Sequence, residues 1–301
     1  MVKAQPTAVD SSARPAPGLP RDRRLAELER AENFPVALRL LPRAAGEHLR
    51  AIYDVARVID DTGDEGAGDH TAELLRLRAG LARVWTQDPP ERGVLARLVP
   101  AVRAGRLEPG PFDRLIEANL RDQRVRRYPR RSDLLEYCTF SADPVGRLVL
   151  AVFGAGTPRT EALSDRVCTG LQLIEHCQDI GEDYHRGRIY LPQEDLHRFG
   201  VREDEFAAAT TSDRLRRLIE FEAEFAAGLL NEGRPLLRLL HGPARLAVAG
   251  YLAGGLAALD ALRRAQWQVL PAGPVPRRRD VVRHVFRLLS HSARPGSGRR
   301  S

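Results

Sequence analysis

The chain has 301 residues, a formal net charge of +7 and a hydrophobic content of 43%, which is enough for a substantial core. A positive charge favours nucleic acid or an anionic membrane as a partner, but Lys3 is the only lysine, arginines occur along the whole chain and aromatic residues make up 6%. No nucleic-acid-binding motif accompanies the charge, so we expect no nucleic-acid partner. Three cysteines without CxxC or Cys/His spacing exclude a zinc site and a disulfide framework, and they favour a reduced, cytoplasmic setting.

In chain order, residues 1–20 are rich in proline and lack the apolar segment of a signal peptide, and we expect a disordered tail there. Residues 21–269 contain no Ser/Gly linker and are expected to form one domain. Residues 270–301 are expected to form a basic tail with a short amphipathic helix, which either docks on the domain or binds an anionic membrane. The longest apolar run, Leu246 to Leu259, is shorter than the roughly 20 residues that span a bilayer, so we expect a soluble or peripheral protein.

Helical periodicity dominates from Leu25 onward, and no stretch shows the sustained alternation of a half-buried strand. The expected fold class is therefore all-α. Thr160 to Tyr184 is predicted as one long central helix, with an acidic end at the mouth of a helical bundle and an apolar part deeper inside. That arrangement suits a ligand with an anionic head and a long apolar tail.

The first candidate site is an acidic cluster at Asp60, Asp61 and Asp64. Residues four apart share one helix face, so Asp60 and Asp64 project together and repel one another. Arg57 and Tyr53 lie one and two turns before Asp60 on the same polar stripe, between apolar neighbours. A surface acidic patch is the alternative interpretation, but the apolar flanks indicate that the stripe lines a cavity.

A second acidic cluster repeats the pattern far along the chain. Gln172, Glu175, Asp179 and Asp183 step by three, four and four residues, again beside apolar positions. Carboxylate oxygens are ligands that hard divalent cations prefer. The two clusters together predict a paired Mg²⁺ site.

Three segments resemble the squalene/phytoene synthase family, the head-to-head isoprenyl diphosphate synthases. Ala51 to Glu65 (AIYDVARVIDDTGDE) resembles the first aspartate-rich motif of that family, and Gln178 to Pro192 (QDIGEDYHRGRIYLP) resembles the second. Glu136 to Gly146 (EYCTFSADPVG) resembles the intervening segment that lines the substrate cavity. The resemblance covers most of the chain and implies a helical bundle around a central cavity.

The resemblance also implies roles for particular residues. Mg²⁺ is the implied cofactor and a prenyl diphosphate the implied substrate. The implied catalytic residues are Asp60, Asp61, Asp64, Asp179 and Asp183. The implied metal ligands are these five aspartates and Glu175. The implied substrate-binding residues are Tyr53, Arg57, Tyr137, Gln172, Gln178 and Arg188. Phe34, Tyr53 and Phe140 are candidates for the lining of the cavity, and His48, His176 and His185 are weaker candidates for carrying a proton.

Within the family, the chain is most similar to the hydroxysqualene-forming branch of bacterial hopanoid biosynthesis. Three features carry this similarity: the segment Glu32 to Val36, Gln178 before Asp179, and the segment after Tyr137. Glu175 departs from the family pattern, because many relatives have Asn there, and Glu can also bind Mg²⁺. The implied reaction joins presqualene diphosphate and water to give hydroxysqualene and pyrophosphate, without NADPH.

Two alternatives remain open. A relative of the same fold condenses two farnesyl or geranylgeranyl diphosphates to presqualene diphosphate, squalene or phytoene. A protein of another class is an inactive helical scaffold that binds a partner enzyme or a membrane. Peripheral membrane association and contact with other hopanoid-pathway enzymes are the partners that we expect besides the substrate.

Overall fold

The computed structural model describes residues 41–65 and 68–291, and within these ranges the chain is built from helices, with one isolated bridge between Arg127 and Ile189. This confirms the all-α prediction. The expected tail 1–20, Phe34 and the segment Glu32 to Val36 lie outside the described residues. The helices are α3 (Arg43–Asp64), α4 (His70–Ala82), α5 (Val99–Arg103), α6 (Pro109–Asp122), α7 (Arg131–Ser141), α8 (Asp143–Val152), α9 (Pro158–Gln178), α10 (Ile180–His185), α11 (Gln193–Phe199), α12 (Asp213–Gly233), α13 (Leu236–Leu239), α14 (Gly242–Arg264) and α15 (Arg278–His291).

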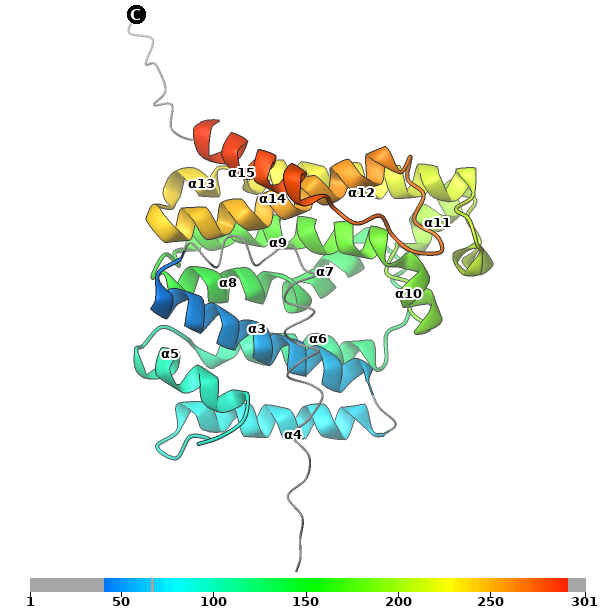
Figure 1. The fold of residues 1–301 in the computed structure, drawn as a ribbon. Helices are drawn as coiled ribbons and strands as arrows, with labels where there is room; N and C mark the ends of the chain where they lie inside the picture. Colours follow the sequence, from blue (N-terminus) through cyan, green and yellow to red (C-terminus); the bar gives the residue numbers. More distant parts are fainter. Residues whose placement is uncertain (1–40, 66–67, 292–301) are drawn as a thin grey trace, which may run out of the picture.

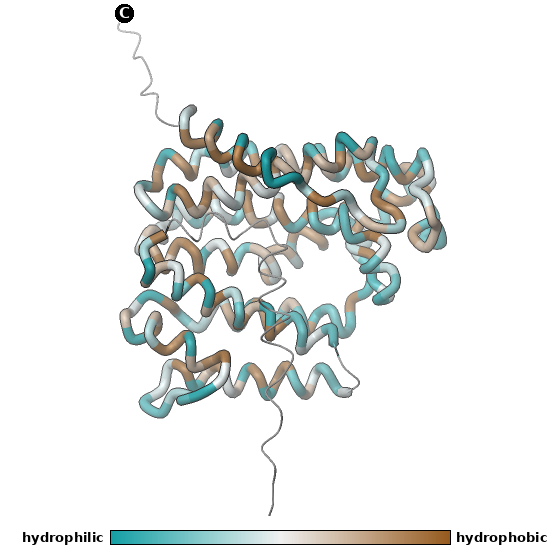
Figure 2. The backbone as a smooth tube through the Cα atoms, viewed as in Figure 1, coloured by the Kyte–Doolittle hydropathy of each residue, from teal (hydrophilic) through white to brown (hydrophobic). Residues whose placement is uncertain are grey.

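The helices stack in tiers around α9. In Figure 1, α4 and α5 lie at the bottom, α3 and α6 above them, α7 and α8 next, and α12, α14 and α15 at the top. Helix α9 packs against α8 on one side and against α12 and α14 on the other. Apolar residues concentrate where these tiers meet, as Figure 2 shows. One core cluster joins α7, α9, α12 and α14, and a second joins α3, α4, α6 and α8.

Helix α9 begins as its sequence predicts and ends earlier than expected. Thr157 caps it by accepting a hydrogen bond from Thr160 N at 3.2 Å, and Pro158 occupies the first turn. The predicted helix from Thr160 to Tyr184 is interrupted at Asp179, which has φ −97° and ψ 13° and separates α9 from α10. At this break a loop from the other end of the domain packs closely: a β-carbon on Gly181 would lie 3.0 Å from Leu270. The 21 residues of α9 span about 31 Å, less than expected for one continuous helix.

The C-terminal segment packs on the bundle. Val281 and Leu288 of α15 are buried and belong to the same core cluster as α9, and Arg245 of α14 donates a hydrogen bond to the Leu289 carbonyl at 2.8 Å. The packed region therefore continues past residue 269. Of the two arrangements considered for the amphipathic helix, the structure shows the docked one.

Helix α14 is the most apolar of the long helices that the structure describes. In the described residues it is the one helix long and apolar enough to cross a membrane by length and composition, with a mean hydropathy of 1.3 over its best window. However, 61% of that window is buried inside the bundle, where Gly255 closely faces Leu171 of α9 and Leu230 of α12. Its apolar character is accounted for by its position in the core.

Candidate functional site

Side chains from both acidic clusters line one cavity. It has a volume of about 870 Å³, including its open mouth. Helix α3 lies on one side of it, and the end of α9 with α10 lies on the other. The predicted residues that line it are Arg57, Asp60, Asp64, Tyr137, Gln172, Glu175, Asp179, Asp183 and Arg188. We call it the polar cavity. Residues more than a hundred positions apart in the sequence thus share one site.

Asp60 is held at the cavity wall by α6. Asn119 Nδ2 donates to Asp60 Oδ1 at 3.0 Å. Helix α3 approaches α6 closely at Gly63, where a β-carbon would collide with the Asn119 side chain. Desolvation in the site raises the pKa of Asp60 to about 6. The hydrogen bond from Asn119 lowers this pKa, whereas the charge of Asp64 raises it further. Because the carboxyl faces the open cavity, water there moderates this desolvation.

Asp64 is tied to the opposite side of the cavity by arginines. It forms an ion pair with Arg188, whose side chain is 10% exposed, and a longer one with Arg186 at 3.4 Å. Arg188 also lies 3.8 Å from Asp122, and Asp122 accepts a 2.6 Å hydrogen bond from the Tyr137 hydroxyl. Arg188 therefore connects α3 with α6, and Asp122 extends the chain of contacts to Tyr137 of α7. Arg186 and Arg188 place two cationic side chains beside the carboxylates.

The aspartates of the second cluster also have raised pKa values. Burial raises the pKa of Asp183 to about 7, and the negative charge of Asp179 is the next cause of the rise. Burial likewise raises the pKa of Asp179 to about 6, and the negative charge of Glu182 is the next cause. His176 stacks on Tyr190 with ring centroids 3.9 Å apart, and burial lowers its pKa to about 3, so that it is neutral at physiological pH. These carboxylates are costly to ionise together, and added positive charge relieves that cost.

The donor set fits Mg²⁺ in one specific way. Among the residues that the structure describes, no three His, Cys, Asp or Glu side chains gather closely enough to hold a metal ion by themselves. Mg²⁺, however, is usually bound through one or two carboxylates and completed by water and substrate phosphate oxygens. Carboxylates facing one another across a cavity with raised pKa values match that requirement. The carboxylates of the polar cavity are therefore the residues that could hold Mg²⁺, with substrate oxygens and water completing its coordination.

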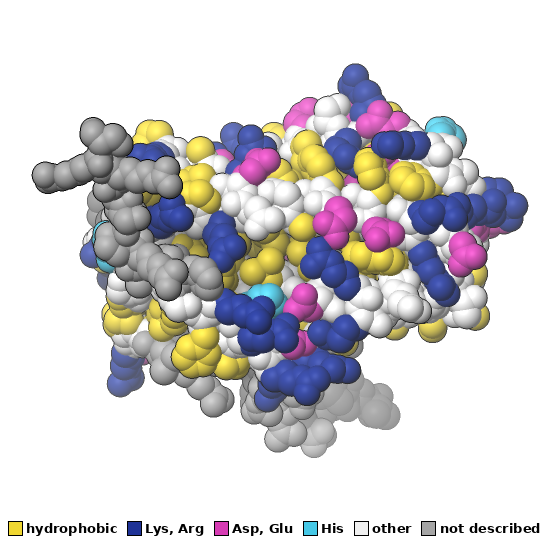
Figure 3. All heavy atoms as spheres, turned by 90° about the horizontal axis from the view of Figure 1, so that it is seen from above, with side chains coloured by type: hydrophobic (Ala, Val, Ile, Leu, Met, Phe, Trp, Pro, Cys, Tyr) yellow, Lys and Arg dark blue, Asp and Glu magenta, His cyan; other side chains and the backbone are white. Residues whose placement is uncertain are grey.

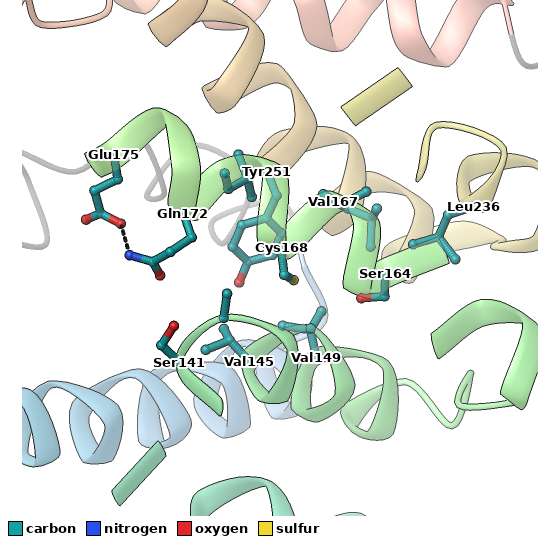
Figure 4. A pocket seen from close by; sticks show the side chains of 14 residues that line it. Ser141, Val145, Val149, Ser164, Val167, Cys168, Gln172, Glu175, Leu236 and Tyr251 are labelled. Carbon is teal, nitrogen blue, oxygen red and sulfur yellow. Dashed lines mark hydrogen bonds between the residues drawn. The ribbon is translucent and has the colours of Figure 1, made fainter. Parts of the chain in front are cut away.

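A second cavity of about 650 Å³, including its open side, adjoins the polar cavity and is apolar. Its walls come from α8, α9 and α14, with Val145, Val149, Leu171 and Val248 among the lining side chains (Figure 4). Ser141, Gln172 and Glu175 line both cavities. The expectation of an acidic mouth above an apolar interior thus corresponds to two connected spaces, which we call the polar and the apolar cavity.

Three of the predicted site residues do not line either cavity. Asp61 forms an ion pair with Arg57 at 3.1 Å beside the polar cavity, and Tyr53 lies nearer the start of α3. Gln178 donates a 2.7 Å hydrogen bond to the Pro274 carbonyl, so its side chain holds the loop after α14 against the end of α9. The substrate-binding role of Gln178 stays a prediction.

Two other candidates also lie outside both cavities. The ring of Phe140 is covered by the Arg121 guanidinium at 3.8 Å, so it does not form the cavity lining that we considered for it. The His185 ring donates a hydrogen bond from Nδ1 to the Gly181 carbonyl within its own helix. Neither side chain is placed to meet a ligand of the polar cavity.

Sequence reasoning missed several residues of the polar cavity: Asn119, Asp122, Arg186 and Tyr190. Asn119 and Asp122 are three apart on α6, are buried, and have Leu115 and Ile116 as apolar neighbours. This is the signal that identified Asp60 and Asp64, a polar pair on one face of an apolar helix. Applied to residues 109–122, the same rule would have found them.

The fold is an all-α bundle in which aspartates from two distant segments of the chain line one cavity. The squalene/phytoene synthase family matches residues 29–283 of the chain. The chain therefore belongs to the squalene/phytoene synthase family, which confirms the resemblance seen in its aspartate-rich motifs.

Relatives within the family catalyse different reactions. The chain is 34% identical over 218 residues to a hydroxysqualene synthase of Rhodopseudomonas palustris, covering 71% of this chain and 73% of that protein. It is 31% identical over 249 residues to a phytoene synthase of Mycobacterium bovis, covering 81% of this chain and 79% of that protein. Among solved structures, the squalene synthase HpnC of Alicyclobacillus acidocaldarius matches with a TM-score of 0.73 and 39% identity, covering 81% of this chain and 94% of that one.

Proposed function

We propose that the protein converts presqualene diphosphate and water to hydroxysqualene and pyrophosphate, in the presence of Mg²⁺ and without NADPH. The junction of the two cavities carries this proposal. A polar cavity with arginines and carboxylates suits a diphosphate, and an apolar cavity beside it suits a long isoprenoid chain. The similarity to hydroxysqualene synthases supports this branch of the family.

The residues on the two sides of the polar cavity have different tasks in this reaction. Asp60 and Asp64 on α3, and Asp179 and Asp183 at α10, would hold Mg²⁺ together with the diphosphate. When bound, Mg²⁺ acts as a Lewis acid that stabilises the negative charge of the leaving diphosphate. Arg188 adds charge-assisted hydrogen bonding to the same oxygens.

The chain must also protect the carbocation that remains after the diphosphate leaves. Val145, Leu171 and Tyr251 line the apolar cavity, and apolar walls disfavour water beside a bound cation. Glu175 lies at the boundary of the two cavities and adds a further carboxylate there. Negative charge at that boundary stabilises a cation formed there.

The competing reaction in the same family is the condensation of two farnesyl or geranylgeranyl diphosphates. The similarity to a phytoene synthase over 81% of the chain favours this alternative. Purified protein with Mg²⁺ is therefore incubated with presqualene diphosphate in one tube and farnesyl diphosphate in another, without NADPH, and the extracts are analysed by mass spectrometry. Hydroxysqualene in the first tube supports the proposal. Products from the second tube alone overturn it, and an absence of products in both favours the inactive scaffold.

We further propose that the enzyme works as a peripheral protein at the cytoplasmic face of an anionic membrane. The outer side of α15 supports this: Arg279, Val282, Arg283 and Phe286 fall on one exposed face, and Phe286 is 71% exposed. Figure 3 shows the molecule from above, the side on which α15 lies, with arginines and apolar side chains interspersed. Basic and apolar residues on one helix face suit an anionic lipid surface.

Vesicle binding tests this membrane proposal. Phe286→Ser is expected to weaken binding to phosphatidylglycerol vesicles roughly tenfold, because it removes an exposed aromatic side chain from the lipid-facing surface. Leu75→Ser, at an exposed leucine of α4 on the opposite side of the bundle, is the matched control and should bind as the wild type does. Equal binding of wild type and Phe286→Ser would contradict the proposal.

A further inference from the structure

The junction between the two cavities contains three polar residues. Ser141, at the end of α7, and Gln172 and Glu175, on α9, line both the polar and the apolar cavity. Figure 4 shows Ser141 extending from one side of the gap toward Gln172 and Glu175 on the other. Because the diphosphate suits one cavity and the chain suits the other, the carbon–oxygen bond that breaks lies at this junction.

Ser141 has a hydroxyl group that the protein does not satisfy. Its Oγ is buried and finds no hydrogen-bond partner among the residues that the structure describes. A buried hydroxyl without a partner costs free energy, and native proteins satisfy nearly all such groups with protein or bound water. Ser141 Oγ at the cavity junction is therefore placed to bind a ligand atom or a water molecule.

Gln172 complements Ser141 from the opposite helix. Its Nε2 donates to Glu175 Oε2 at 3.3 Å, as the dashed line in Figure 4 marks. That bond uses one donor of the amide and leaves the amide oxygen as an acceptor. A water molecule between α7 and α9 would thus meet a hydroxyl on one side and an amide oxygen on the other, within the two to four polar partners that a buried water needs.

We propose that Ser141, together with Gln172, positions the water molecule that ends the reaction. This inference rests on the proposed function. The carbon–oxygen bond of the substrate breaks, and its electron pair leaves with the diphosphate. After the cation rearranges, a lone pair of the positioned water forms the new carbon–oxygen bond. One proton of that water passes to the released diphosphate, so that the products are an alcohol and protonated pyrophosphate.

Positioned water decides between two fates of the cation. A cation in the apolar cavity that meets no nucleophile loses a proton from carbon and gives a hydrocarbon. Water held by Ser141 at the junction, the boundary of the apolar cavity, gives the alcohol instead. Ser141 is thus a positioning residue that sets the ratio of alcohol to hydrocarbon, and it has no part in breaking the bond to the diphosphate.

Ser141→Ala tests the inference in the full-length protein. With presqualene diphosphate and Mg²⁺, we expect pyrophosphate release within threefold of the wild type and a roughly tenfold fall in the alcohol-to-hydrocarbon ratio, the size expected for one lost hydrogen bond. Pyrophosphate release also shows that the variant is folded. Thr139→Val is the matched control, because it also removes a hydroxyl from α7. The Thr139 hydroxyl donates to the Glu136 carbonyl, and Thr139 lines neither cavity.

The outcomes separate this inference from the proposed function. A wild-type protein that makes no hydroxysqualene overturns both. A wild type that makes hydroxysqualene, with an unchanged product ratio in Ser141→Ala, overturns the role of Ser141 alone. Ser141→Thr, which restores a hydroxyl, should recover the alcohol; a ratio as low as that of the alanine variant would also contradict the role of the hydroxyl.

Discussion

The polar and apolar cavities share helix α9 but are held together by different forces. In the polar cavity, charged side chains from α3, α6 and the segment after α10 constrain one another, as in the contacts of Arg188 with Asp64 and Asp122. In the apolar cavity, close helix packing sets the shape: a β-carbon on Gly146 of α8 would collide with Ser164 and Cys168 of α9. Chemistry at the mouth should therefore be sensitive to single charges, and binding in the interior to side-chain volume.

The largest expected effect is the removal of one charge at the mouth. Asp183→Asn keeps the size of the side chain and removes an oxygen ligand, so we expect a fall in kcat on the order of a thousandfold. Folding should be unharmed, because the raised pKa of Asp183 shows that its ionised form is disfavoured in the folded protein. Pyrophosphate release and thermal unfolding measure the two effects.

Asp204→Asn is the matched control for this variant, because Asp204 is exposed and pairs with Arg202 away from both cavities. It should retain wild-type turnover. Full activity in Asp183→Asn together with a large loss of melting temperature would show that Asp183 is a structural residue, and the comparison between the cavities would fail at its polar side.

A change of volume in the interior is expected to have the next largest effect. Val145→Phe adds bulk to the wall of the apolar cavity, so we expect kcat/KM for the isoprenoid diphosphate to fall roughly a hundredfold through competition for space. Inhibition by inorganic pyrophosphate should be unchanged, because the polar cavity is intact. Val125→Phe, at a valine that is 38% exposed, is the control. Equal weakening of pyrophosphate and substrate would show that the cavities are not separable.

The pH dependence of stability gives a smaller effect. Asp183 has a pKa of about 7 in the folded protein and about 3.9 when unfolded. Between these values the folded state binds more protons than the unfolded state, so the contribution of Asp183 to stability falls as pH rises through this window. Without metal, Asp183→Asn should match the wild type near pH 4 and exceed it by about 1–3 kcal/mol at pH 8. Chemical unfolding in EDTA at several pH values measures this difference, and a constant difference would contradict it.

The sequence predicted the mouth far better than the interior, for a physical reason. Asp60 and Asp64, and Asp179 and Asp183, stand out because repelling charges at helical spacing among apolar residues need an explanation. The apolar cavity leaves no such signal, because Val145 and Leu171 look like any core residues until α8, α9 and α14 are placed together. Shape that arises from packing distant helices is absent from local periodicity.

The end of α9 shows the same limit at the level of one element. Periodicity continues from Thr160 to Tyr184, so one helix was the reasonable prediction. The break at Asp179 coincides with packing of Leu270 and Gly273, which lie some ninety residues away in sequence, against Gly181 and Gln178. A tertiary contact overrides local helical preference there, and it turns Gln178 away from the polar cavity.

The smallest expected effect separates two glutamines of α9. Gln172 lines both cavities, whereas Gln178 bonds to Pro274 outside them. We expect Gln172→Ala to lower kcat/KM about tenfold with little change in melting temperature. Gln178→Ala should lower stability by about 1 kcal/mol, the net worth of one hydrogen bond, and leave kcat/KM within threefold. A strong loss of turnover in Gln178→Ala at unchanged stability would restore its predicted contact with the substrate, and it would mean that the loop at residues 270–276 moves away from α9 when the substrate binds.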